Sequence, residues 1–175
     1  MNPFFHRALL LSALLLPFTL CAQDVRVVTR VVKDTVPAWK VWKSDAFSIR
    51  HPGKWAVETP AAGDTVVVFR RLDTPVRMIV QGIDGKAAPF KQRIAAQHAV
   101  GLEVIDSGGD NGEGTHWAEY EYGTEGSRVH LLQRVQEADG RSYIFTYAAP
   151  AASYDDYLYV AEAMYNSFAP ATGGK

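Results

Sequence analysis

The sequence predicts an α+β fold, in which a signal peptide precedes a central antiparallel β-sheet with flanking helices. Short segments of alternating apolar and polar residues are separated by turns too short for a crossover, so neighbouring strands should run antiparallel. Two further segments, 89–101 and 153–168, have the apolar spacing of helices that can cover a sheet. No regular alternation of strand and helix is visible, which argues against a parallel sheet.

Residues 1–22 have the pattern of a secretory signal peptide. Arg7 precedes an apolar run over 8–20, which is shorter than the roughly 20 residues that a membrane-spanning helix needs. The small residue Ala22 ends the segment, and we expect cleavage after it, with Gln23 as the new N-terminus. The protein is therefore expected to be exported, to the periplasm or the extracellular space.

Cys21 leaves a second interpretation open, in which the exported protein is a membrane-anchored lipoprotein. A bacterial lipoprotein signal has a small residue before its cysteine, whereas Leu20 stands here, so lipidation of Cys21 fits less well than cleavage after Ala22. Association with a membrane is expected only if Cys21 is lipidated. Cleavage after Ala22 would remove the only cysteine, and the mature chain could then form no disulfide.

Length and charge limit the classes of partner. Removing 22 of the 175 residues leaves 153, the size of one ordinary domain. The formal net charge of −1 becomes −2 when Arg7 is lost, which gives no electrostatic basis for binding nucleic acid or an anionic membrane.

Residues 23–43 are interpreted as an N-terminal tether, which could also add an edge strand. The segment is rich in valine and basic residues and is interrupted by Pro37. Trp39 and Trp42 lie near its end. They either pack onto the domain or form an exposed contact for a partner, because tryptophan is favoured in protein interfaces.

The domain itself is predicted over 44–170, with 171–175 as a flexible tail. Pro52 and Gly53 mark the turn after the first strand, and four glycines predict a loop over 107–114. Strands are expected at 47–50, 55–58, 65–71, 76–83, 102–106, 115–122, 127–137 and 142–148.

The two helices are predicted from their ends and their apolar stripes. The first should begin at Pro89, stop at Gly101 and carry His98 on its inner stripe. In the second, Ser153 is the expected N-cap, and Tyr159 lies off the apolar stripe, where it is a candidate partner contact. That stripe comprises Tyr154, Tyr157, Leu158, Ala161, Met164, Tyr165 and Phe168.

The order of these elements resembles that of the PsbP-like proteins of the Mog1/PsbP superfamily. The segment 47–55 reads FSIRHPGKW, with an aromatic and an aliphatic residue before a proline turn and a tryptophan at the next strand. The chain also has a mid-chain helix, a strand meander through 143–147 and a closing helix that ends in Ser167-Phe168. The resemblance covers about 44–170.

This resemblance implies a central antiparallel sheet with helices on its faces. Members of the superfamily include extrinsic oxygen-evolving subunits of photosystem II, small Ran-binding proteins and many exported bacterial proteins and lipoproteins. They act mainly by binding and assembly, so the resemblance supplies no catalytic residues. The tether over 23–43 is unusual for the family, and no photosynthetic role is inferred.

The residues themselves predict no catalytic, cofactor or metal site. There is no G-x-S-x-G motif, and the paired acids at 155–156 are explained by a helix N-terminus. His116, Glu119 and His130 could approach one another across a hairpin, but alternation puts His116 and Glu119 on opposite faces of their strand. We instead expect Glu119 and Glu121 on a polar outer face of the sheet.

The function favoured by the sequence is therefore a non-enzymatic envelope protein that binds or assists another exported component. The partner is expected to be another envelope protein. An alternative is a carrier that holds a small molecule or metal ion in a cleft beside the sheet. An enzyme of unknown type is the third hypothesis.

Overall fold

The computed structural model describes residues 38–59, 65–109 and 116–171, all within the compact unit Val32–Lys175. The predicted signal peptide, Cys21, most of the tether and residues 172–175 lie outside the described residues. No helix in the described ranges is long and apolar enough to cross a membrane.

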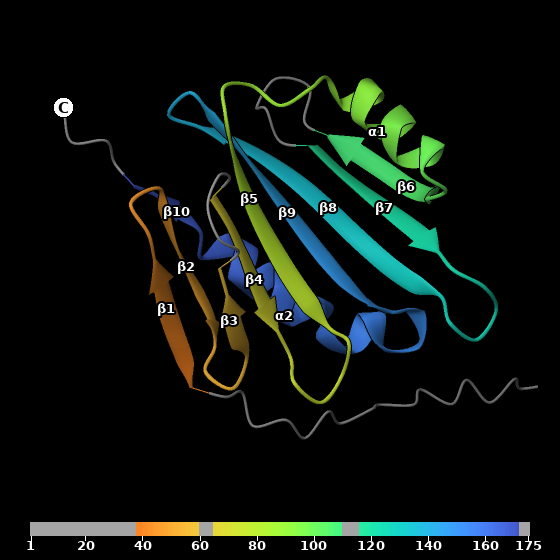
Figure 1. The fold of residues 1–175 in the computed structure, drawn as a ribbon, viewed down its shortest axis with the longest axis horizontal. Helices are drawn as coiled ribbons and strands as arrows, with labels where there is room; N and C mark the ends of the chain where they lie inside the picture. Colours follow the sequence, from red (N-terminus) through yellow and green to blue (C-terminus); the bar gives the residue numbers. More distant parts are fainter. Residues whose placement is uncertain (1–37, 60–64, 110–115, 172–175) are drawn as a thin grey trace, which may run out of the picture. The chain divides into compact units, whose positions relative to one another are not determined.

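The main element is a seven-stranded sheet in the order β3-β4-β5-β9-β8-β7-β6 (Figure 1). Every neighbouring pair in it is antiparallel, which confirms the predicted α+β class. Its strands are β3 (Ala56–Glu58), β4 (Thr65–Arg70), β5 (Arg77–Asp84), β6 (Glu103–Gly109), β7 (His116–Tyr122), β8 (Val129–Ala138) and β9 (Arg141–Pro150).

A second, three-stranded sheet joins the two ends of the described chain. It consists of β1 (Trp39–Lys43), β2 (Phe47–Pro52) and β10 (Ala169–Pro170), with β2 in the middle. The last five residues of the predicted tether form the edge strand β1, which is the role that the sequence left open for this segment.

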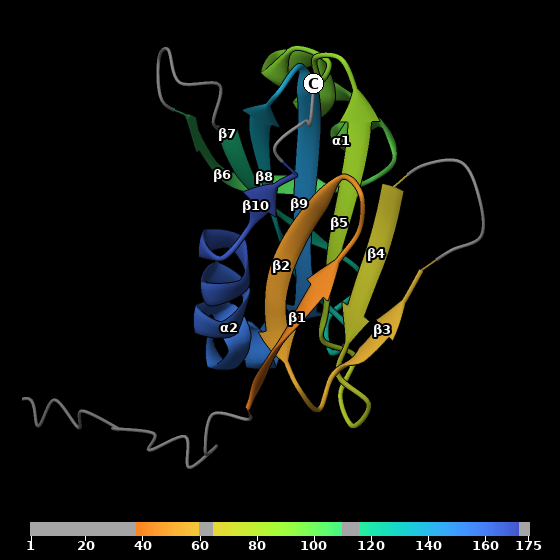
Figure 2. The same cartoon turned by 90° about the vertical axis from the view of Figure 1, so that its left-hand side faces the viewer.

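Helix α2 (Tyr154–Asn166) and strand β2 lie side by side on one face of the large sheet (Figure 2). Alternate residues of β5 and β9 point into this core, as the two-residue period of a strand requires. Burying each large side chain stabilises the fold by roughly 1.5–3 kcal/mol. The most deeply buried include Phe47, Ile49, Val67, Phe69, Val80, Phe145, Tyr147 and Met164.

The terminal helix is confirmed, but its first turn differs from the prediction. One 3-10 turn, Ala151–Ser153, precedes α2. Ser153 occupies the N-cap position without capping the helix, because its hydroxyl donates to the carbonyl of Pro150 at 3.4 Å instead.

Helix α1 (Phe90–Ala99) lies beside β6, toward the other face of the sheet (Figure 1). It packs through Arg93, Ile94 and Gln97, which are half-buried, and Arg93 donates a hydrogen bond to Gln133 of β8. This stripe turns His98 toward solvent, so the prediction that His98 lies on the inner stripe was wrong.

The predicted loop over 107–114 was also wrong at its start, because β6 continues through Gly109. Gly108 and Gly109 provide space for neighbouring side chains rather than a turn. A Cβ atom at Gly108 would lie 2.8 Å from the indole nitrogen of Trp117 on the neighbouring strand, and one at Gly109 would collide with the ring of His116. Glycine therefore lets β6 pair closely with β7.

Candidate functional site

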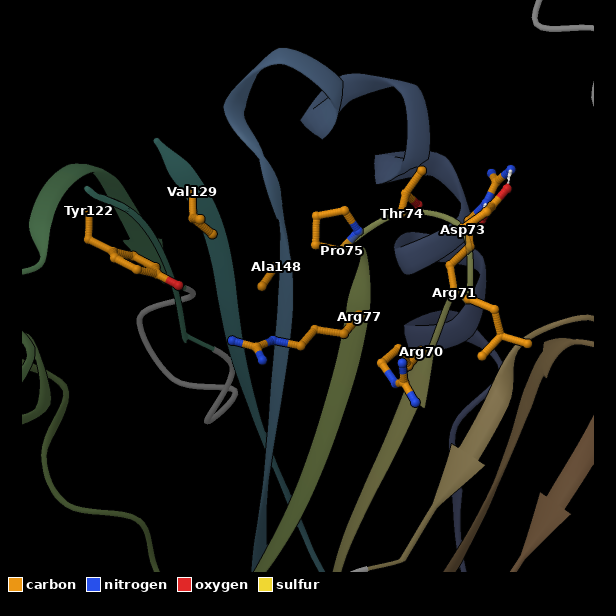
Figure 3. Close-up of a pocket in the computed structure, with 10 residues that line it drawn as sticks. Arg70, Arg71, Asp73, Thr74, Pro75, Arg77, Tyr122, Val129 and Ala148 are labelled. Carbon is orange, nitrogen blue, oxygen red and sulfur yellow. Dashed lines mark hydrogen bonds and ion pairs between the residues drawn. The ribbon is translucent and has the colours of Figure 1, made fainter. Parts of the chain in front are cut away.

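A groove of about 540 Å³ lies where β4 turns into β5 (Figure 3). The connection between these strands forms one wall, and residues of β7, β8 and β9 form the other. Its volume is in the range of small-molecule sites. The lining residues are Arg70, Arg71, Leu72, Asp73, Thr74, Pro75, Arg77, Tyr122, Val129 and Ala148.

Two arginines in this groove lie directly opposite each other on paired strands. The register of β4 and β5 pairs Arg70 with Arg77, so both side chains leave the same face of the sheet. On its other side Arg77 is paired with Ala148, whose small side chain leaves room above β9. Figure 3 shows the Arg77 side chain extending from β5 across β9 in the direction of Tyr122.

The arginines of the groove differ in how their charges are compensated. Arg70 donates to Glu58 from Nε at 3.0 Å and from Nη2 at 2.6 Å. Arg71 pairs with Asp73, whose carboxyl pKa is held below its usual value by this hydrogen bond. For the exposed Arg77, the described part of the chain contains no ion-pair partner. Arg77 is thus the groove's available cation.

Large apolar side chains border the same groove and remain in contact with solvent. Leu72 is 70% exposed and Tyr122 is 38% exposed. Arg71 is not available beside them, because its guanidinium lies 4.7 Å from the ring centre of Tyr157 on α2. The groove therefore combines one free cation with an apolar border.

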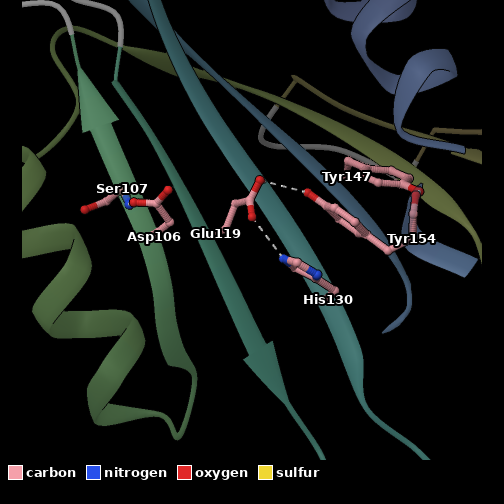
Figure 4. A network of polar contacts seen from close by, with 6 residues as sticks. All are labelled: Asp106, Ser107, Glu119, His130, Tyr147 and Tyr154. Carbon is pink, nitrogen blue, oxygen red and sulfur yellow. Dashed lines mark hydrogen bonds and ion pairs between the residues drawn. The ribbon is translucent and has the colours of Figure 1, made fainter. Parts of the chain in front are cut away.

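A separate polar network links α2 to the sheet (Figure 4). The carboxylate of Glu119 accepts a hydrogen bond from the hydroxyl of Tyr154 at 3.3 Å, and its other oxygen lies 3.2 Å from Nε2 of His130. The rings of His130 and Tyr154 stack with centres 3.7 Å apart. The hydroxyl of Tyr147 donates to the carbonyl of Tyr154 at 2.7 Å.

This network corrects the prediction that Glu119 lies on a polar outer face. The register places Glu119 and Leu132 opposite each other on the face that carries α2, and the Glu119 side chain is only 25% exposed. Burial, and then the nearby carboxylate, raise the pKa of the Tyr154 phenol. Burial also raises the pKa of Tyr147. Both hydroxyls therefore stay protonated and act as donors.

The histidines do not assemble into a metal site within the described residues. His116 and Glu119 lie three positions apart on β7 and so point to opposite faces, as predicted. Among the histidines of the described ranges, His130 is the one with a contact to the Glu119 carboxylate given above. No group of three His, Cys, Asp or Glu side chains in the described ranges could hold a metal ion.

The predicted contact residues occupy different environments. Trp39 and Trp42 are half-buried and pack against the core, and the ring centre of Trp42 lies 5.0 Å from that of Phe47. The guanidinium of Arg50 lies 5.6 Å from the Trp39 ring. Tyr159 is 45% exposed on α2, and no ring contact in the described part of the chain joins it to either tryptophan. Their role in binding a partner stays a prediction.

Sequence reasoning missed the residues that define the groove, Arg70, Arg77 and Tyr122. The sequence did contain a signal for the arginine pair. The predicted strands end at 71 and begin at 76, and pairing these two ends places Arg70 opposite Arg77. The contribution of Tyr122 had no such signal, since it comes from a strand on the far side of the sheet.

The arrangement is that of a PsbP-like α+β domain, a Mog1/PsbP-like fold, as the sequence resemblance predicts. No protein-family model and no curated protein matches the sequence. The solved structures similar to it include the solution structure of cyanobacterial PsbP (CyanoP) from Synechocystis sp. PCC 6803. That likeness has a TM-score of 0.55 at 16% identity and covers 79% of this chain and 95% of CyanoP.

A crystal structure from Bacteroides thetaiotaomicron VPI-5482 is similar as well. It has a TM-score of 0.50 at 14% identity, and the match covers 80% of this chain but only 50% of the Bacteroides chain. At such identities the likenesses establish the fold alone.

Proposed function

We propose that this chain is an exported, non-enzymatic binding protein that holds an anionic ligand in the groove between the β4–β5 connection and Tyr122. The observation that carries the proposal is the pairing of Arg70 with Arg77 on one face of the sheet. Of the functions expected from the sequence, we thus favour the carrier that holds its ligand in a cleft beside the sheet. Contact with another envelope protein stays a prediction.

The arginine pair is unfavourable for the fold on its own. Like charges directly opposite each other on paired strands destabilise by roughly 0.2–1 kcal/mol. Glu58 compensates Arg70, but both side chains of that ion pair are about half exposed, and exposed pairs contribute little. An anion bound to the Arg77 guanidinium would compensate its charge through charge-assisted hydrogen bonds.

Arginine is suited to this role because its planar fork of N–H donors matches the oxygens of carboxylates and phosphates. Tyr122 supplies a further hydroxyl on the opposite wall (Figure 3). The groove therefore offers an anion one free guanidinium, a second one already held by Glu58, and a phenol.

The test is thermal unfolding of the purified chain in phosphate and in chloride of equal ionic strength. A ligand that binds only the folded state raises the midpoint, so we expect a rise with increasing phosphate concentration. Arg77→Gln should reduce this rise to the part that phosphate causes by its exclusion from protein surfaces in general. Lys91→Gln, which makes the same change of charge at an exposed position of α1, should retain it.

The same variants distinguish a site from general screening. In chloride of low ionic strength, Arg77→Gln should unfold at a higher temperature than the wild type, because it relieves the repulsion from Arg70. A phosphate response that is equal in the wild type, Arg77→Gln and Lys91→Gln would reject the groove as an anion site. The absence of any response to phosphate in the wild type would also reject it.

A further inference from the structure

A second cavity of about 660 Å³ adjoins the arginine groove. The two share Pro75 and Val129 as walls, so the second extends the first along the end of the sheet. Both of these residues appear beside Ala148 and Tyr122 in Figure 3. The second cavity is lined by Pro75, Glu125, Gly126, Ser127, Arg128, Val129, Pro150, Ala151 and Ala152.

The character of the surface changes between the two cavities. The shared walls and the far wall are built from proline, valine and alanine, and no arginine in the second cavity is free in the way Arg77 is. Arg128 there lies 3.3 Å from a carboxylate oxygen of Glu121. The exposed Glu125 would also repel a second anionic group. Arg77, which has no ion-pair partner in the described residues, lies at the groove end of this surface.

Exposed apolar side chains also border the groove end of this surface. Leu72 and Tyr122, two of the large hydrophobic residues left exposed in the described chain, both border the arginine groove. Apolar side chains around a polar anchor are typical of small-molecule sites. The surface therefore suits a ligand that is charged at one end and apolar along the rest.

We propose that the ligand is a single-chain amphiphile, with a carboxylate or phosphate head group at Arg77 and an alkyl chain over Pro75, Val129 and the 150–152 wall. This inference rests on the proposed function and specifies the ligand of the same groove. Charge complementarity fixes the orientation, because the head group meets Arg70 and Arg77 while the chain points away from them.

The expected signature is a dependence of affinity on both head group and chain. Burying one methylene contributes about 0.8 kcal/mol, which corresponds to about fourfold in affinity. An eight-carbon chain that is only partly covered should therefore still raise the affinity at least about tenfold over the head group alone. We expect octyl phosphate to bind at least tenfold more tightly than inorganic phosphate. Octyl glucoside, with an equal chain and a neutral head group, should bind at least tenfold more weakly than octyl phosphate.

The experiment is calorimetric titration of the purified chain with inorganic phosphate, butyl phosphate, octyl phosphate, octanoate and octyl glucoside, all below micelle formation. Arg77→Gln should weaken every anionic ligand by a similar factor. Ala152→Ser, which adds a hydroxyl to a wall that belongs to the second cavity and not to the arginine groove, should reduce the gain from butyl to octyl while leaving inorganic phosphate unchanged. Lys91→Gln is the matched charge control and should leave all affinities unchanged.

The outcomes distinguish failure of the amphiphile proposal from failure of the anion site itself. Equal affinity for inorganic and octyl phosphate would overturn the amphiphile while leaving an anion site that takes free phosphate. Octyl glucoside binding as tightly as octyl phosphate would overturn it as well, because the head group would then have no role. Failure of every anionic ligand to bind would overturn both proposals together.

Discussion

Arg77 occupies a position that the fold by itself does not favour. Its backbone pairs normally with β4 and β9, yet its side chain is placed opposite a second arginine and over an alanine. A neutral residue would give a more stable hairpin, since like charges opposite each other are destabilising. Such a conflict between local stability and residue choice is typical of positions kept for binding.

Gly108 is a second position where residue choice is constrained, because a Cβ atom there would affect the stability of the fold. A Cβ at Gly108 would lie 2.8–2.9 Å from three atoms of the Trp117 indole, which packs against the core. We expect Gly108→Ala to lower the free energy of unfolding by about 1–3 kcal/mol, the usual cost of overpacking. Urea denaturation followed by tryptophan fluorescence measures it.

Ser107→Ala is the control for this prediction, because Ser107 is exposed on the same strand and its change should cost less than about 0.5 kcal/mol. Equal stability of Gly108→Ala and the wild type would mean that β6, as an edge strand, moves aside without cost.

At two places the sequence pattern was noticed but the role of the residues was predicted wrongly. The glycines over 107–114 were correctly seen as unusual, but composition alone cannot distinguish a glycine that allows a turn from one that makes room for a neighbouring ring. His98 was placed on the wrong side of α1 because a stripe at 90, 94 and 98 differs from the observed one by a rotation of about one residue.

At the scale of elements, α2 is attached to the sheet by more than its apolar stripe. Its first residue, Tyr154, stacks on His130 of β8 and donates to Glu119 of β7, so one side chain connects the helix to two strands (Figure 4). Tyr147 of β9 holds the backbone of the same residue. The start of α2 is therefore fixed by hydrogen bonds that need protonated phenols.

This attachment predicts a loss of stability in alkali. The folded state raises the pKa of Tyr154 and Tyr147 above 10.0, so it binds more protons than the unfolded state once the pH exceeds about 10. The stabilisation is complete below pH 10 and is lost as the pH rises above it. We expect the free energy of unfolding of the wild type to stay level up to about pH 10 and to fall progressively as the pH rises above 10.

Tyr154→Phe tests the origin of this loss. The variant should be less stable at pH 8 by about 0.5–1.5 kcal/mol, because it lacks the hydrogen bond to Glu119, but its stability should fall less steeply above pH 10. Tyr159→Phe, an exposed tyrosine on the same helix, should behave as the wild type. Parallel pH profiles for Tyr154→Phe and the wild type would contradict the assignment.

Among the elements, those with a long apolar stripe or clear alternation were predicted well, and their ends were not. The stripe on α2 is confirmed, whereas the cap at Ser153 is replaced by a 3-10 turn whose hydrogen bonds depend on where β9 ends. The alternation of polar and apolar residues along β7 was predicted correctly, but Glu119 lies on the face that carries α2 and not on an outer face. Alternation alone does not specify which face of a sheet a helix will cover.

At the scale of the whole molecule, the sequence predicted one α+β domain but not how its ends meet. β10 is two residues long and contains Pro170, so it has no strand signal of its own. It forms only because β2 offers Phe47 and Ser48 as pairing partners. On its other edge β2 pairs with β1, which is the edge strand that the tether segment was expected to be able to add.

Export is the last prediction, and the mature N-terminus decides it. When the full sequence is expressed in a bacterium with a secretory pathway, we expect the protein in the periplasmic or extracellular fraction, with an intact mass that begins at Gln23. Cys21→Ser should yield the same mature mass, because residue 21 leaves with the signal peptide. A membrane-bound product whose mass exceeds the chain by a lipid, and which Cys21→Ser abolishes, would show that Cys21 is the anchor. The groove would then act at a membrane surface rather than free in the compartment.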